Sequence, residues 1–164
     1  MAARLLLEAV GGKGKVAILS HPEVASVSDR VRGFKEELAG QPDIQLVAEL
    51  FSEGKRDKAY RVTEDLLQAH ADLNGLFAIN DDTALGALAA IEASGKAGRI
   101  QVIGYDATPE ARAKIASRAL YGDVVQSPRR IGLLTIEAVH DYFLGKSPPA
   151  VIPVEVGTFT GQAP

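Results

Sequence analysis

The stretch LFAINDDTALGALAAIEASGKAGRIQVIGYDATP, Leu76 to Pro109, decides the fold that we expect for this chain. It opens on a short apolar run at 76–79, of the kind that a buried parallel strand needs. A polar turn at 80–83 and a helical run at 84–94 follow, and Gly95 is placed to end that helix. A second apolar run at 101–104 leads into a second polar turn at 105–109. Polar residues therefore sit just past the carboxyl ends of two successive strands, where open α/β sheets bind ligands.

The rest of the chain continues this alternation. Further strands are expected at 16–19, 44–51, 120–126 and 151–159, and helices at 28–39, 58–70, 110–117 and 130–144. The first twelve residues predict a brief helix that Gly11 and Gly12 end. Such a pattern predicts an α/β fold with a mostly parallel sheet and helices on both of its faces. A length of 164 residues indicates a single domain.

Composition excludes several classes of protein. A net charge of −3 with scattered Lys and Arg argues against nucleic acid as a partner. The absence of cysteine excludes disulfides and thiolate metal sites. No apolar run approaches the ~20 residues of a membrane span. The first twelve residues are too short for a signal peptide, so we expect none in this chain.

Four polar residues lie at the expected strand exits. Arg30 is placed in the first turn of the helix after the first strand, and Asn80, Asp106 and Gln126 each end or follow a strand. A carboxylate can accept hydrogen bonds from two neighbouring hydroxyls, amides donate and accept, and arginine offers a fork of donors. Taken singly, Asn and Asp at such positions are more often helix caps or turn formers. Their joint placement at one sheet edge favours a neutral, polyhydroxylated ligand.

Signals of catalysis or metal binding are weak. His21, His70 and His140 show no ligand spacing, and adjacent carboxylates such as Asp81 and Asp82 more often cap a helix than hold a metal. The GGKGK run at 11–15 precedes a strand instead of opening a helix, so it is no phosphate loop. No G-x-S-x-G nucleophile elbow is present. We expect no catalytic residue, metal or cofactor.

Four motifs, in this order, resemble the carboxy-terminal half of ribose-type periplasmic sugar-binding proteins of bacterial ABC importers. They are DRVRGFKEEL at 29–38, FAINDDTALGALAAIEASGK at 77–96, IQVIGYDATPEARAKI at 100–115 and ALYGDVVQSPRRIG at 119–132. The resemblance implies a three-layer lobe, one of the two lobes of the periplasmic-binding-protein fold, covering residues 1–164. It also implies a periplasmic or lipid-anchored location for the longer protein and ABC permease subunits as partners.

The resemblance assigns sugar contacts to the same four residues that the strand-exit argument selects. The arginine of the R-x-x-GF helix matches Arg30, and the asparagine of the F-A-x-N-D turn matches Asn80. The aspartate of the G-[FY]-D turn matches Asp106, and a hinge glutamine matches Gln126. One position departs from the pattern: Gly54 stands where ribose binders carry an aromatic that stacks on the sugar, with Phe51 nearby.

The resemblance also implies that half of a sugar cleft lies outside this chain, on an amino-terminal lobe. Half a cleft should bind weakly, because pockets normally enclose 70–90% of a ligand. In the family, the helix that matches 130–144 packs on the first lobe. Without that lobe its apolar residues lack a partner, so we expect the helix to fold back on its own domain or to pair with a second copy in a homodimer. The residues in question are Ile131, Leu134, Ile136, Val139 and Phe143.

Two other classes remain open from the sequence. The effector-sensing domain of a sugar-responsive, LacI-type transcription regulator shares the fold and the asparagine and aspartate turns, although such regulators usually lack the segment seen here at 122–128. A small flavodoxin-like enzyme or response regulator would need a nucleophile or an acidic pocket at a strand end. Asp106 alone is a poor candidate for that, because no second acid ends the first strand.

Overall fold

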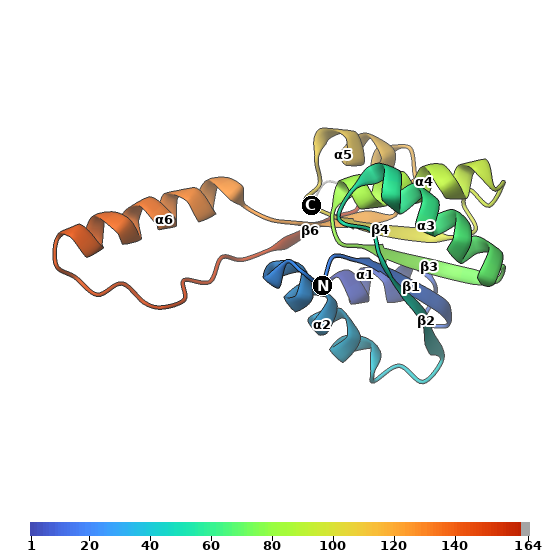
Figure 1. The fold of residues 1–164 in the computed structure, drawn as a ribbon, viewed down its shortest axis with the longest axis horizontal. Coiled ribbons are helices and arrows are strands. Elements are labelled where there is room, and N and C mark those ends of the chain that lie inside the picture. Colours follow the sequence, from blue (N-terminus) through green and yellow to red (C-terminus); the bar gives the residue numbers. More distant parts are fainter. Residues whose placement is uncertain (162–164) are drawn as a thin grey trace.

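A six-stranded sheet forms the middle of the protein, and helices cover both of its faces (Figure 1). The computed structural model describes residues 1–161. The strand order is β2-β1-β3-β4-β5-β6; neighbouring strands are parallel except β6, which runs antiparallel to β5. The strands are β1 (Gly14–Ser20), β2 (Ile44–Phe51), β3 (Leu73–Ala78), β4 (Gln101–Tyr105), β5 (Gly122–Val125) and β6 (Gly157–Phe159).

Five of the helices cover the sheet, and the sixth stands apart from it. Helices α1 and α2 cover one face, while α3, α4 and α5 cover the other (Figure 1). Their bounds are α1 (Ala2–Ala9), α2 (Ala25–Leu38), α3 (Arg56–Ala69), α4 (Asp81–Ala93), α5 (Pro109–Ala116) and α6 (Pro128–Phe143). The predicted fold class, a three-layer α/β lobe with a mostly parallel sheet, is confirmed.

Two hydrophobic cores, one on each face of the sheet, follow from the alternation of side chains along the strands. In β1, Val16 and Ile18 point into the core under α1 and α2. Ala17 and Leu19 point into the other core, under α3, α4 and α5. All four side chains are completely buried, which is why the sequence of this strand is a continuous apolar run instead of an alternating one.

Element bounds differ from the predicted ones in three informative places. Helix α2 begins at Ala25, not at Ser28, so Arg30 lies in its second turn instead of its first. Helix α4 begins at Asp81, not at Ala84, because the Asn80 side chain caps it. The last strand is confined to 157–159 instead of 151–159, since only those residues find a partner in β5.

Helix α6 extends away from the sheet, and the chain returns along 144–156 to enter β6 (Figure 1). Helix α6 and the returning segment 144–156 together form an arm. The expectation that α6 folds back on its own domain is therefore wrong. None of its residues is buried, and Ile136 and Phe143 are 67% and 81% exposed. The helix faces only the returning segment, and the two line an apolar groove of about 610 Å³. Both ends of the arm are held at the sheet edge by β5 and β6, which keeps α6 off the two cores.

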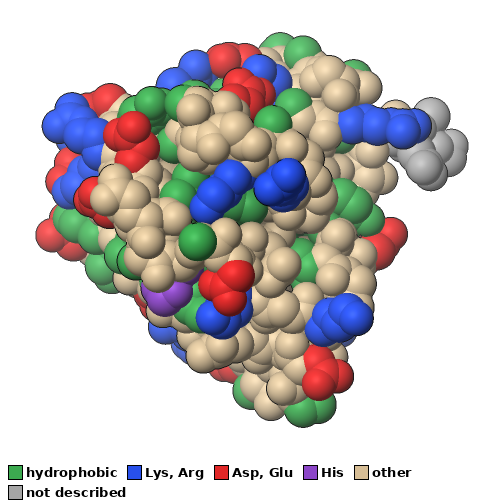
Figure 2. Space-filling model, turned by 90° about the vertical axis from the view of Figure 1, so that its right-hand side faces the viewer, with side chains coloured by type: hydrophobic (Ala, Val, Ile, Leu, Met, Phe, Trp, Pro, Cys, Tyr) green, Lys and Arg blue, Asp and Glu red, His purple; other side chains and the backbone are tan. Residues whose placement is uncertain are grey.

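The end of the molecule opposite the arm shows acidic and basic side chains interspersed, with no large patch of one sign (Figure 2). Within residues 1–161, no helix is both long enough and apolar enough to cross a membrane.

Candidate functional site

The four residues selected from the sequence all lie at the carboxyl ends of the parallel strands. Arg30 follows β1, Asn80 follows β3, Asp106 follows β4, and Gln126 follows β5. Each of the four side chains is half-buried. Asp106 and Gln126 are in direct contact, and Asn80 and Asp106 line the same pocket.

Arg30 reaches from α2 across the edge of the sheet. Its Nη1 donates to the carbonyl oxygen of Ile79 at 2.7 Å, and its guanidinium lies 3.7 Å from the centre of the Tyr105 ring. Stacking on an aromatic face fixes the plane of the guanidinium while leaving its other N–H groups free to donate. Arg30 is thereby held beside the residues that precede Asn80 and Asp106.

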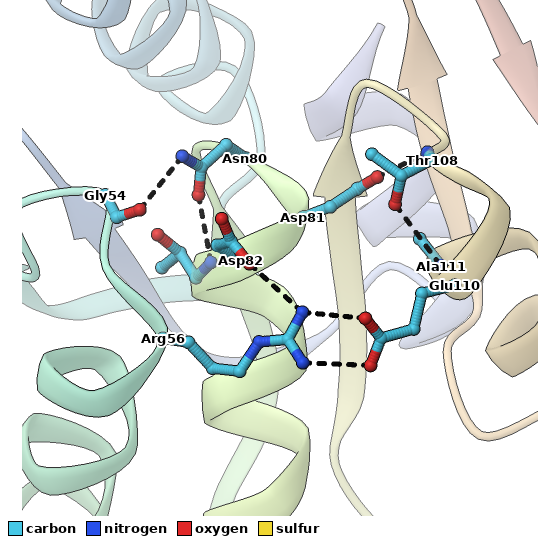
Figure 3. A network of polar contacts seen from close by, with 9 residues as sticks. Gly54, Arg56, Asn80, Asp81, Asp82, Thr108, Glu110 and Ala111 are labelled. Atoms are coloured by element: carbon cyan, nitrogen blue, oxygen red, sulfur yellow. Dashed lines mark hydrogen bonds and ion pairs between the residues drawn. The ribbon is translucent and has the colours of Figure 1, made fainter.

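Asn80 has the cap role that its position suggested, and it is also anchored to a second element. Its Oδ1 accepts from the backbone N–H of Thr83 at 2.9 Å, which caps α4. Its Nδ2 donates to the carbonyl oxygen of Gly54 at 3.1 Å, after β2 (Figure 3). An amide group has two N–H donors and two acceptor lone pairs, so one of each remains for a ligand.

Asp106 and Gln126 form a direct pair. Gln126 Nε2 donates to Asp106 Oδ1 at 2.6 Å. Asp106 has φ 110° and the next residue, Ala107, has φ 53°; both lie in the left-handed region that residues with a side chain rarely adopt. Such strain persists only where the surroundings enforce it, and it is concentrated at functional sites.

The surroundings of Asp106 also change its acidity. Burial raises its pKa above the ordinary aspartate value, while the hydrogen bond from Gln126 and the charge of Arg30 act in the opposite direction. Asp106 is thus a carboxyl group with few competing waters and two fixed polar neighbours. These are the conditions under which hydrogen bonds from neutral hydroxyls gain most.

Asn80 and Asp106 line one pocket of about 410 Å³ together with a cluster of ion pairs. Arg56, the first residue of α3, donates to Asp82 at 3.0 Å and to both carboxylate oxygens of Glu110, at 2.9 and 2.8 Å (Figure 3). These bonds join the amino-terminal ends of α3, α4 and α5. Because the three side chains are about half exposed, they contribute little to stability and serve mainly to align the helix ends around the pocket.

The region where the sequence departs from the ribose-binding pattern lies at the same edge. Phe51, the last residue of β2, pairs with Ser20 at the end of β1 and is 37% exposed. Lys58 Nζ lies 4.3 Å from the centre of its ring, and the ring of His21 lies 5.4 Å away. One face of Phe51 is therefore covered by a cation. That Phe51 stacks on a sugar in place of the missing aromatic stays a prediction.

Three contributors to the site were not predicted from the sequence. Tyr105 supports Arg30, Arg56 joins three helix ends, and Asp123 lies fully buried in β5 beneath Asp106. The sequence signal that could have identified Asp123 is an aspartate inside a short, otherwise uncharged strand.

Within residues 1–161, no group of three or more His, Asp or Glu side chains is arranged to hold a metal ion.

Replacing Asn80 by alanine should lower the stability of the chain. Loss of an N-cap typically costs about 1 kcal/mol, and the bond to Gly54 adds to that loss. Thermal or urea unfolding of the Asn80→Ala variant checks this. Asn74→Ala is not a suitable control, because the Asn74 side chain also accepts a backbone hydrogen bond. Gln41 lies at a half-buried loop position and its side chain makes no hydrogen bond within residues 1–161, so Gln41→Ala should unfold like the original. Equal stability of the Asn80 and Gln41 variants would contradict the cap.

The fold and this polar edge define an α/β lobe of the kind that binds a ligand beyond the carboxyl ends of its strands. The chain belongs to the family described as periplasmic binding protein domain, whose profile matches residues 1–147.

Several curated relatives with detectable sequence similarity are named as sugar-binding proteins. The chain is 41% identical over 147 residues to the ribose import binding protein RbsB of Bacillus subtilis, an alignment that covers 89% of this chain and 47% of that protein. It is 27% identical over 141 residues to the D-allose-binding periplasmic protein of Escherichia coli, covering 85% of this chain and 45% of that protein. The chain spans about half the length of the curated relatives it matches.

Solved structures agree with the fold over nearly the whole chain. A periplasmic solute-binding protein of an ABC transporter from Actinobacillus succinogenes, crystallised with D-allose, superposes with a TM-score of 0.92 at 33% identity, covering 98% of this chain and 57% of that one. GanP, a glucose-galactose binding protein from Geobacillus stearothermophilus, superposes with a TM-score of 0.93 at 27% identity, again covering 98% and 57%.

Proposed function

We propose that this chain is the carboxy-terminal, sugar-binding lobe of the solute-binding component of a bacterial ABC-type sugar importer, and that it is not an enzyme. The observation that carries the proposal is the polar edge, where Gln126 donates to the half-buried carboxyl group of Asp106 and Asn80 lines the same pocket. The charge of Arg30 acts on the same carboxyl group. The similarity to ribose import and D-allose-binding proteins supports it, and favours an importer component over the sensing domain of a sugar-responsive transcription regulator.

The chemistry of the edge suits a monosaccharide. Asp106 keeps acceptor capacity beyond its bond to Gln126, so it can accept from two neighbouring hydroxyls. Arg30 supplies donors in a fixed plane, and Asn80 supplies one donor and one acceptor. All three are oriented before a ligand arrives, which lowers the entropy cost of binding. The net selectivity is for a small neutral molecule with several adjacent hydroxyls.

The proposed function is that of a longer protein with two lobes. In it, an amino-terminal lobe would supply the other side of the cleft and would cover the apolar arm of α6. Sugar would bind between the lobes, and ABC permease subunits would receive it; the periplasm or the outer leaflet of the membrane, through a lipid anchor, would be the site of action. The exposed apolar side chains of α6 support this arrangement, because burying each large one stabilises by roughly 1.5–3 kcal/mol.

Calorimetric titration of the two-lobe protein with ribose, galactose, xylose, arabinose and inositols tests the proposed function. We expect at least one of these to bind with 1:1 stoichiometry and the others more weakly. The 164-residue chain alone should bind the same sugar far more weakly, since it encloses only one side of it. Failure of every sugar in the panel to bind the two-lobe protein would argue against the proposal.

The isolated chain is expected to form a homodimer through α6. Its apolar residues, exposed in the single chain, would be covered by the same residues of a second copy. Light scattering should then give a mass near twice 17.3 kDa, and the double change Ile136→Lys, Phe143→Lys should give a monomer. The matched control Glu137→Lys, which adds a lysine to the same helix at another exposed position, should leave the dimer intact. A strictly monomeric original chain would contradict the expectation.

A further inference from the structure

Two aspartates lie buried beneath the candidate site without a counter-charge. Asp123, in β5, is fully buried, and Asp81, the first residue of α4, is 3% exposed. Within residues 1–161, no Lys, Arg or His side chain forms an ion pair with either carboxyl group. Both oxygens of Asp123 and Oδ1 of Asp81 have no hydrogen-bond partner. A buried, ionised carboxylate without partners is very costly, so such a group normally keeps a proton.

The two carboxyl groups converge on the same small space beside Gly104. Gly104 is the partner of Asp123 in the pairing of β4 with β5. A Cβ on Gly104 would overlap Asp123 Oδ1 and would lie 3.0 Å from Asp81 Oδ1. The missing side chain of this glycine thus provides the space in which the two acids meet. Like charges so close together cannot both ionise readily, whereas one proton held between them satisfies unpartnered oxygens on both sides.

One member of the pair is bonded to the turn that carries Asp106. Asp81 Oδ2 accepts from the backbone N–H of Thr108 at 2.6 Å (Figure 3). Thr108 directly follows Asp106 and Ala107, the two residues with left-handed backbones. Its own side chain accepts from Ala111 N–H at 3.4 Å to cap α5. The bond to Asp81 is therefore a clamp at the carboxyl end of the strained segment.

We propose that Asp81 and Asp123 share one proton at neutral pH, and that this acid pair holds the β4–α5 turn so that Asp106 keeps its ligand-facing conformation. The proposal rests on the proposed sugar site for its functional consequence. Asp123 is in this account a positioning residue that acts through Asp81 and Thr108 and does not touch the sugar. Loss of the proton would set two carboxylates against each other and loosen the turn.

The charges around the pair all favour keeping the proton. Burial, then Asp81, then Asp106 raise the pKa of Asp123 to about 8, against a smaller lowering by the backbone of Gly104. On the neighbouring strands, Asp123 faces Gly104 in β4 and Phe159 in β6, neither of which is charged. Two cations of this region act elsewhere: Arg112 of α5 stacks on Phe159 and donates to the carbonyl oxygen of Ala107, and Arg30 acts on Asp106.

The acid pair should make the folding stability of the chain fall as the pH rises. The folded chain holds this proton more tightly than the unfolded chain, whose aspartates have a pKa of 3.8. The stabilisation that this proton contributes is therefore complete below about pH 4 and is lost as the pH rises from there to about 8. The Asp123→Asn variant cannot lose a proton, and its amide can still donate to Asp81. Its melting temperature should exceed that of the original chain by a margin that grows between pH 5 and pH 9.

The shared proton can be tested directly in the unmodified 164-residue chain, with no sugar present. Infrared difference spectra should show the carbonyl stretch of a protonated carboxylic acid at pH 7 that disappears with a midpoint near pH 8 and is absent from Asp123→Asn. Hydrogen exchange at the Thr108 amide should lose protection over the same pH range in the original chain only. A chain whose aspartates are all ionised at pH 6 would overturn the proposal, whether or not Asp123→Asn folds.

The effect of the proton on sugar binding is measured in a separate experiment. At pH 9, about a tenth of the original molecules would keep the proton, so affinity for the best-binding sugar should be about tenfold weaker than at pH 6. Asp123→Asn should bind equally at both pH values. A proton that titrates as expected in the chain, together with no sugar binding by the two-lobe protein, supports the acid pair and refutes the proposed function alone. An equal loss of affinity at pH 9 in both proteins would overturn the positioning role.

Discussion

Replacing Asp106 by alanine in the two-lobe protein is expected to weaken sugar binding by about 100-fold or more. A carboxylate that accepts from two hydroxyls makes two charge-assisted hydrogen bonds, each contributing about 1.5–3 kcal/mol. Their joint loss is at least about 3 kcal/mol, and each 1.4 kcal/mol is a factor of ten in affinity. The loss also leaves Gln126 without its partner at 2.6 Å. Calorimetric titration with the best-binding sugar measures the change.

Two further variants separate the carboxylate from the backbone at this position. Alanine at φ 110° is strained, whereas asparagine tolerates left-handed backbones better, so Asp106→Asn should lose affinity with less loss of stability. Asp57→Ala is the matched control: Asp57 is an exposed aspartate whose recorded side-chain bond is to Arg61, on the same helix. Its affinity should equal that of the original. Unchanged affinity in the Asp106 variants would refute the assigned site.

Replacing Gly86 by alanine is expected to destabilise the chain by about 1–3 kcal/mol or more. Gly86 lies in α4 where that helix crosses α3, and a Cβ there would overlap the carbonyl oxygen of Arg56 and lie 3.0 Å from Ala59 Cβ. A backbone atom cannot move aside without moving its helix, and overpacking of this kind typically costs about 1–3 kcal/mol, occasionally more. Because Arg56 opens α3 beside Asn80 and Asp82, the shift would also spread into the site. Urea unfolding of Gly86→Ala measures the loss.

Gly132 provides the matched control for Gly86. It also lies within a helix, α6, but a Cβ there meets no other atom within 4 Å. Alanine is favoured over glycine inside helices by about 1 kcal/mol, so Gly132→Ala should leave the domain as stable as before or slightly more stable. A Gly86→Ala chain that unfolds at the same urea concentration as Gly132→Ala would contradict the close packing of α3 on α4.

Most of the fold could be predicted because its signals are local. Continuous apolar runs such as 16–19 and 76–79 are typical of strands buried on both faces, and both lie in the sheet. The bounds of α4 were missed by three residues because an asparagine cap extends a helix toward its amino end, and a cap is decided by one side-chain bond. Residues 151–156 were predicted as strand and are not, because their apolar sequence has no neighbouring strand to pair with.

The candidate site was only partly predictable. Arg30, Asn80, Asp106 and Gln126 could be selected because a parallel sheet brings strand exits to one edge, and the structure places all four there. The left-handed turn at Asp106 and the support of Arg30 by Tyr105 depend on tertiary contacts that no local pattern reports. Of the two alternatives expected for α6, folding back on its own domain is wrong and pairing with a second copy stays a prediction, because an apolar sequence indicates burial but not the molecule that provides it.

The most direct measurement for the proposed sugar half-site is a nuclear magnetic resonance titration of the ¹⁵N-labelled 164-residue chain with each sugar of the panel. Weak binding is sufficient for this method, so the chain can be used without an amino-terminal lobe. We expect saturable chemical-shift changes at the amides and side chains of Arg30, Asn80, Asp106 and Gln126, with the signals of the α6 arm unchanged. Shifts confined to the apolar groove of the arm, or none for any sugar at concentrations that saturate a weak site, would contradict it.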